Sequence, residues 1–170
     1  MSSSNYEREL KGILQGDAST LFSVTKSCSS LEKEKYMMIM EKPFIVVRAA
    51  GSYGFDLVAV RGDISFLAEI KSSNSDTIHF SSISGKLQKQ AQTMRKECER
   101  TKTLPIYAFR LKNYRGDAWR VFTLEMDGLE GRLKVLHKCL PKLEVSKGSN
   151  LIMRWRDGMP LSEFINYLTR

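Results

Sequence analysis

The chain has 170 residues and 42% of them are hydrophobic, which is enough for one domain with a buried core. Its 27 basic and 19 acidic residues give a net charge of +8, so a polyanion such as nucleic acid is the expected partner. The three cysteines are odd in number and far apart, which argues against a disulfide framework and a zinc site. The N-terminus is polar and no run approaches about eighteen apolar residues, so we expect a cytoplasmic protein without a membrane span.

A first helix is predicted over residues 5–15, because its apolar residues repeat at helical spacing. Ser4 is followed three residues later by Glu7, which matches a capping box at the start of that helix. One interpretation of Glu7 is therefore structural, with its carboxylate accepting a hydrogen bond from the backbone at the helix start.

A second helical region is predicted over residues 19–42. Ser29 with Glu32 again matches a capping box, and Pro43 marks the end of the region. Residues 37–40 form an apolar patch within it. Two interpretations of this patch stay open, since it suits either the core or a contact with a second copy of the chain.

Short apolar runs bounded by turn residues predict several strands through the middle of the chain. Gly62 and Asp63 lie between two such runs and are typical of a two-residue hairpin turn. A helix over residues 84–101 follows, with its apolar stripe at helical spacing. The predicted strands cover residues 44–49, 56–61, 64–71, 78–80, 106–111 and 119–124.

Fewer elements are predicted in the C-terminal quarter of the chain. A strand is expected over residues 151–155, and a closing amphipathic helix over residues 161–168. Trp119 and Trp155 alternate with apolar residues and are predicted to lie in the core. Together the elements predict a single α/β domain over residues 1–170, in which helices flank a sheet with both parallel and antiparallel pairs.

Three charged residues on two of these strands are predicted to meet. Side chains alternate along a strand, so Glu69 and Lys71 share one face. The turn at residues 62–63 makes the flanking strands antiparallel neighbours, which brings Asp56 beside that pair. Charged groups gathered in an apolar sheet are costly unless a cation or a substrate compensates them.

Such a group suits metal-assisted hydrolysis of a phosphodiester. Mg²⁺ prefers oxygen ligands, and two carboxylates with the carbonyl of Ile70 would supply part of its shell. The metal would lower the pKa of a bound water, and Lys71 would orient that water or stabilise the transition state. The alternative interpretation is a surface Glu–Lys pair on an edge strand, with Asp56 as a turn residue.

Several short motifs, taken in their order along the chain, closely resemble the archaeal Holliday junction resolvases of the PD-(D/E)xK nuclease superfamily. The resemblance is strongest over residues 5–125 and leaves residues 126–170 as an extension of the same domain. It implies a restriction-endonuclease-like fold. The motifs that carry it are residues 6–10, 46–52, 56–59, 69–71, 104–108 and 119–122.

The resemblance also implies roles for individual residues. Asp56 and Glu69 match the metal-binding acids, and Lys71 matches the catalytic lysine. Glu7 resembles the helical acid that reaches the metal, so it joins both the metal-binding and the catalytic group. Ser52 is assigned to the catalytic group and to the DNA contacts. The further positions that resemble phosphate-contacting residues are Arg8 and Arg48.

Two departures from the family pattern bear on substrate selection more than on chemistry. Phe55 stands before Asp56, where the family motif has a proline. The stretch over residues 18–42 is longer than the usual link between the first helix and the first strand.

Other possible DNA contacts come from the residue pattern alone. Lys86, Lys89 and Gln90 form a polar helix face that could follow DNA phosphates, although a solvated face is the alternative. In the same way, Arg48 could be a surface residue at a strand end, and Ser52 a turn residue.

We therefore expect a Mg²⁺-dependent nuclease, with Mn²⁺ as a possible substitute, that resolves four-way DNA junctions by paired symmetric nicks. It is expected to act as a homodimer, without a small-molecule cofactor or a membrane, near the nucleoid. The dimer surface would come from residues 37–40 or from the C-terminal segments 151–155 and 164–168, which are equally suited to the core. Two alternatives stay open: another nuclease of the superfamily acting on flaps or duplex DNA, and a junction-binding protein without catalysis.

Overall fold

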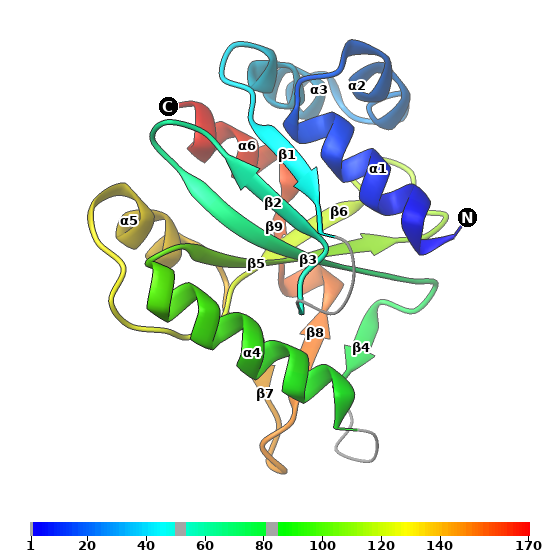
Figure 1. The fold of residues 1–170 in the computed structure, drawn as a ribbon. Helices are drawn as coiled ribbons and strands as arrows, with labels where there is room; N and C mark the ends of the chain where they lie inside the picture. The colour runs from blue at the N-terminus through cyan, green and yellow to red at the C-terminus, as the bar shows by residue number, and fades with distance from the viewer. Residues whose placement is uncertain (1, 50–53, 81–84) are drawn as a thin grey trace.

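A six-stranded mixed sheet forms the centre of the computed structural model, which describes residues 2–49, 54–80 and 85–170 (Figure 1). The strand order is β1-β2-β3-β5-β6-β9, and β3 and β5 run parallel while the other neighbours are antiparallel. The predicted mixed sheet is therefore confirmed. Its strands are β1 (Ile45–Arg48), β2 (Leu57–Val60), β3 (Ser65–Ser73), β5 (Leu104–Leu111), β6 (Trp119–Phe122) and β9 (Met159–Pro160).

Helices cover both faces of this sheet. Figure 1 shows α1 (Ser3–Leu14) and α6 (Leu161–Thr169) above it, and α4 (Lys86–Thr101) below. Phe66 of β3 points to the upper face, where its ring contacts that of Phe164 at 5.8 Å between centroids. Because side chains alternate along a strand, the neighbours of Phe66 point toward α4. The parallel pair requires a crossover, and α4 forms part of it.

A small three-stranded sheet lies beside α4. It contains β4 (Thr77–His79), β8 (Leu151–Arg154) and β7 (Glu144–Val145), in the order β4-β8-β7. The sequence did not predict β7, β9 or the helix α5 (Gly131–Cys139). A two-residue strand is too short to show alternation in the sequence, and only its backbone pairing defines it.

The region before β1 folds into short helices, α2 (Ala18–Val24), α3 (Ser30–Met37) and the 3₁₀ turn η1 (Met38–Met40). The capping box of Ser29 and Glu32 is confirmed, with both reciprocal hydrogen bonds present. The box predicted for Ser4 and Glu7 is wrong. The helix α1 begins earlier, with Ser2 as its N-cap, so Glu7 lies beyond the first turn and its carboxylate bonds elsewhere.

The apolar patch of residues 37–40 packs largely against the core. Ile39 is fully buried, whereas Met40 is 49% exposed. α3 and η1 pack against α6, whose apolar residues Phe164 and Leu168 are also buried. All three segments considered for a dimer surface contribute buried side chains to the core, and the dimer itself stays a prediction.

The two tryptophans lie in the core, as predicted. Trp119 and Trp155 are both buried, and their indole N–H groups donate to Glu9 Oε1 and to the Ala118 carbonyl. The three cysteines carry free thiols. Among the residues that the structure describes, no helix is long and apolar enough to span a bilayer.

Candidate active site

The hairpin of β2 and β3 brings Asp56, Glu69 and Lys71 together, as the sequence predicts. Leu57 pairs with Ala68 in the register, and the Asp56 amide donates to the Ala68 carbonyl at 2.9 Å, so Asp56 lies beside Glu69. Lys71 Nζ donates to Glu69 Oε1 at 2.7 Å. Asp56 Oδ2 accepts a hydrogen bond from the Ile70 amide at 2.7 Å, which holds that carboxylate against β3.

Burial dominates the electrostatics of the two acids. Glu69 is only 5% exposed, and burial raises its pKa to about 7, against the lowering effect of Lys71. Burial also raises the pKa of Asp56, while the Ile70 amide opposes this shift and the charge of Glu7 adds to it. Two carboxyls this close favour the binding of a cation, because a positive charge would stabilise both ionised forms.

Replacing Glu69 with glutamine is expected to make the metal-free protein less sensitive to pH. The pKa of Glu69 is raised to about 7 in the folded state from 4.5, so the folded state binds more protons between these values. The wild type should therefore lose up to about 1.4 kcal/mol of stability per pH unit as pH rises through this window.

Urea denaturation of both proteins with EDTA, from pH 5 to 8, measures this difference. The stability of the Glu69→Gln variant relative to wild type should rise up to about neutral pH and then stay level. A difference that does not change with pH would contradict the shifted pKa.

The arrangement fits a cation held by two carboxylates. In a strand the N–H and C=O of one residue point to the same side, so the Ile70 carbonyl points to the side of Asp56. Mg²⁺ commonly keeps several waters beside one or two carboxylates. The described residues contain no group of three His, Cys, Asp or Glu side chains arranged to hold a metal.

Glu7 is engaged by Arg48 instead. Arg48 Nη2 and Nε donate to Glu7 Oε2 at 2.6 and 3.1 Å, joining α1 to the end of β1. The charge of Glu7 nevertheless acts on Asp56, which places it at the same end of the sheet. Its role as a third metal ligand stays a prediction.

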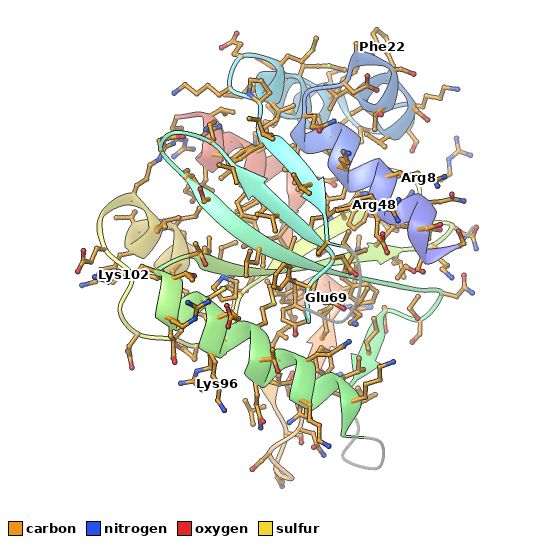
Figure 2. The ribbon with its side chains drawn as sticks, viewed as in Figure 1. Arg8, Phe22, Arg48, Glu69, Lys96 and Lys102 are labelled. Carbon is orange, nitrogen blue, oxygen red and sulfur yellow. The ribbon has the colours of Figure 1, made fainter. Side chains whose placement is uncertain are left out.

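The predicted DNA contacts lie on both sides of the acids. Figure 2 shows Arg8 and Arg48 on the α1 side of the sheet, with Glu69 between them and α4. On α4, Lys86 and Lys89 are exposed while Gln90 is partly buried, so these three do not form one solvated face. Ser52 lies outside the described residues.

Tyr107 lies beside the site but was not selected from the sequence. It lies on β5 directly opposite Glu69 in the parallel register. In the sequence it is one aromatic residue within an apolar strand, which is typical of core. The available signal was the hydroxyl, a polar group among the apolar residues at 104–109.

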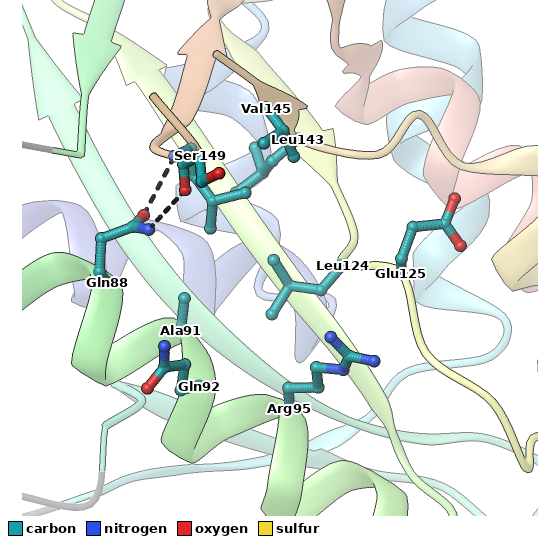
Figure 3. Close-up of a pocket in the computed structure, with 10 residues that line it drawn as sticks. Gln88, Ala91, Gln92, Arg95, Leu124, Glu125, Leu143, Val145 and Ser149 are labelled. Carbon is teal, nitrogen blue, oxygen red and sulfur yellow. Dashed lines mark hydrogen bonds between the residues drawn. The ribbon is translucent and has the colours of Figure 1, made fainter. Parts of the chain in front are cut away.

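A separate hollow of about 210 Å³ lies between α4 and the hairpin of β7 and β8 (Figure 3). Gln88 donates to the Ser149 carbonyl at its rim and accepts from the Leu151 amide. Ala91, Leu124 and other apolar side chains form its wall. None of the three clustered charged residues lines it, so it is distinct from the candidate active site.

The mixed sheet with helices on both faces matches the fold of a solved resolvase structure. A similar solved structure is that of Hjc, a Holliday junction resolvase from the archaeal hyperthermophile Archaeoglobus fulgidus. The match has a TM-score of 0.50 and 17% sequence identity, and covers 72% of this chain and 82% of that one. No family model and no curated protein matches the sequence. The likeness establishes the fold alone.

Proposed function

We propose that this protein is a divalent-cation-dependent endonuclease that resolves four-way DNA junctions by paired symmetric nicks. The observation that carries the proposal is the pair of neighbouring carboxylates, the buried Glu69 and the partly buried Asp56, with Lys71 bonded to Glu69. The fold shared with Hjc, itself a Holliday junction resolvase, supports the choice of substrate.

Each residue of the group has a distinct task in this chemistry. Asp56 and Glu69 would hold the cation, Mg²⁺ or Mn²⁺, which supplies a water of lowered pKa and neutralises charge on the scissile phosphate. The Ile70 amide fixes the Asp56 carboxylate in place. Lys71 would donate to the phosphate oxygens, whose negative charge increases in the transition state.

Substrate binding would depend on the positive charge of the protein and on the two-fold symmetry of the junction. The net charge of +8 suits a polyanion, and Arg8, Lys86 and Lys89 are exposed for contact with phosphates. A junction has near-two-fold symmetry, so a two-fold homodimer could place one active site on each of two opposing strands.

Cleavage of a synthetic four-way junction, beside linear duplex, flap and single strand, tests the proposal. Paired nicks in the junction alone, present with Mg²⁺ and absent with EDTA, are expected. Cutting of flaps or duplex at a similar rate would retain the hydrolytic chemistry but reject the substrate. Tight junction binding without cutting under Mg²⁺ or Mn²⁺ would indicate a binding protein and contradict the proposed activity.

A further inference from the structure

The Tyr107 hydroxyl is a buried polar group without a hydrogen-bond partner among the described residues. Tyr107 is fully buried, and its ring contacts that of Phe80 at 5.8 Å between centroids. Buried tyrosines usually bond their hydroxyl. Tyr36 shows the ordinary case here, because its hydroxyl donates to Asp117 at 2.6 Å.

Tyr107 lies on the face of the sheet that carries the Glu69 carboxylate. Tyr107 and Glu69 are register partners on neighbouring parallel strands, so their side chains lie on the same face of the sheet. The charges of Glu69 and Asp56 both act on Tyr107 and, together with burial, raise its pKa. Phenylalanine would fill the same space without a polar atom to satisfy.

A second buried atom without a partner among the described residues belongs to α4, which covers this face of the sheet. Gln90 Oε1 is buried and also lacks a partner within the described part of the chain. Its helix packs against the segment that leads to Asp56, since a Cβ on Gly54 would lie 3.6 Å from the Gln90 carbonyl oxygen. Buried polar groups are normally paired, so each of these two atoms on the α4 side of the sheet requires a partner such as a bound water.

We propose that Tyr107 is a positioning residue of the cation site. Its hydroxyl oxygen would accept a hydrogen bond from a water bound to the cation that Asp56 and Glu69 hold. This inference rests on the proposed function, and it adds a residue from β5 to a site otherwise built from β2 and β3.

The test is the Tyr107→Phe variant, without DNA. Titration with Mn²⁺, followed by the electron paramagnetic resonance of the free ion, should show affinity reduced by about tenfold or more, the range typical for loss of an outer-shell partner. The melting temperature of the metal-free variant, in EDTA, should equal or exceed that of the wild type, because removal of the hydroxyl leaves no buried donor unpaired. Reduced Mn²⁺ affinity without a loss of thermal stability distinguishes this role from a structural one.

Tyr36→Phe is the matched control. It removes a hydroxyl that is bonded in the core, so it should lower the melting temperature and leave Mn²⁺ affinity unchanged. Unchanged Mn²⁺ affinity in Tyr107→Phe, or a lower melting temperature in EDTA, would overturn the inference.

Junction cleavage by the wild type is measured in parallel. If the wild type cuts the junction and Tyr107→Phe binds Mn²⁺ normally, only the role of Tyr107 is wrong. If the wild type neither binds Mn²⁺ nor cuts the junction, the proposed function is wrong and the inference falls with it.

Discussion

Glu69→Gln is expected to slow junction cleavage by roughly a hundred- to a thousandfold, the range typical for loss of one preorganised electrostatic group. Glutamine keeps the volume of the side chain but removes the charge that would hold the cation. It also removes the ion pair with Lys71, whose Nζ lies 2.7 Å from Glu69 Oε1 in the wild type. Junction affinity should change little, because phosphate contacts supply most of the binding free energy.

Single-turnover cleavage rates and junction dissociation constants of the same preparations measure the two effects separately. Glu99→Gln is the matched control, since it makes the same chemical change on the surface of α4, in an ion pair with Arg95. That variant should cut at the wild-type rate. Wild-type cleavage by Glu69→Gln would reject the assignment of the active site.

Asp117→Ala is expected to destabilise the fold by about 2–4 kcal/mol, because it leaves more than one buried polar group unpaired. Asp117 is 2% exposed. Its Oδ1 accepts from the Tyr36 hydroxyl at 2.6 Å, and its Oδ2 accepts from the Ser162 amide at 3.0 Å. One carboxylate therefore joins α3 to the first turn of α6, where a negative charge also interacts favourably with the helix dipole.

Thermal unfolding followed by circular dichroism checks this expectation. A loss of about 2–4 kcal/mol corresponds to roughly 5–15 °C in a domain of this size. The exposed Asp127 provides a control, because Asp127→Ala should melt within about 1 °C of the wild type. An equally small change for Asp117→Ala would show that the α2–α3 region is not anchored through this carboxylate.

The part of the candidate site that a single hairpin forms could be predicted from the sequence. The two-residue turn and the alternation of side chains place Asp56 beside Glu69, and both are local properties. The environment of those groups was not predictable. The Ile70 amide bound to Asp56 and the unpartnered Tyr107 hydroxyl depend on how three strands align in space.

Glu7 illustrates the limit of local patterns. Its spacing from Ser4 matches a capping box, yet the helix starts earlier and the carboxylate binds Arg48, forty-one residues away. The same motif at Ser29 and Glu32 forms the box as predicted. The two segments share the same Ser–Glu spacing, so this pattern does not distinguish them. They differ in their tertiary contacts, because Glu7 binds Arg48 of β1.

By itself, the sequence determined the α/β class, most strands and helices, and the meeting of Asp56, Glu69 and Lys71, because periodicity and turn chemistry act between near neighbours. Only the tertiary structure decided the parallel pairing of β3 with β5, the short strands β7 and β9, and the partners of Glu7, Asp117 and Tyr107. Apart from the local hairpin of β7 and β8, these contacts join segments that are far apart along the chain. Their free energy comes from burial and pairing that exist only once the whole domain has packed.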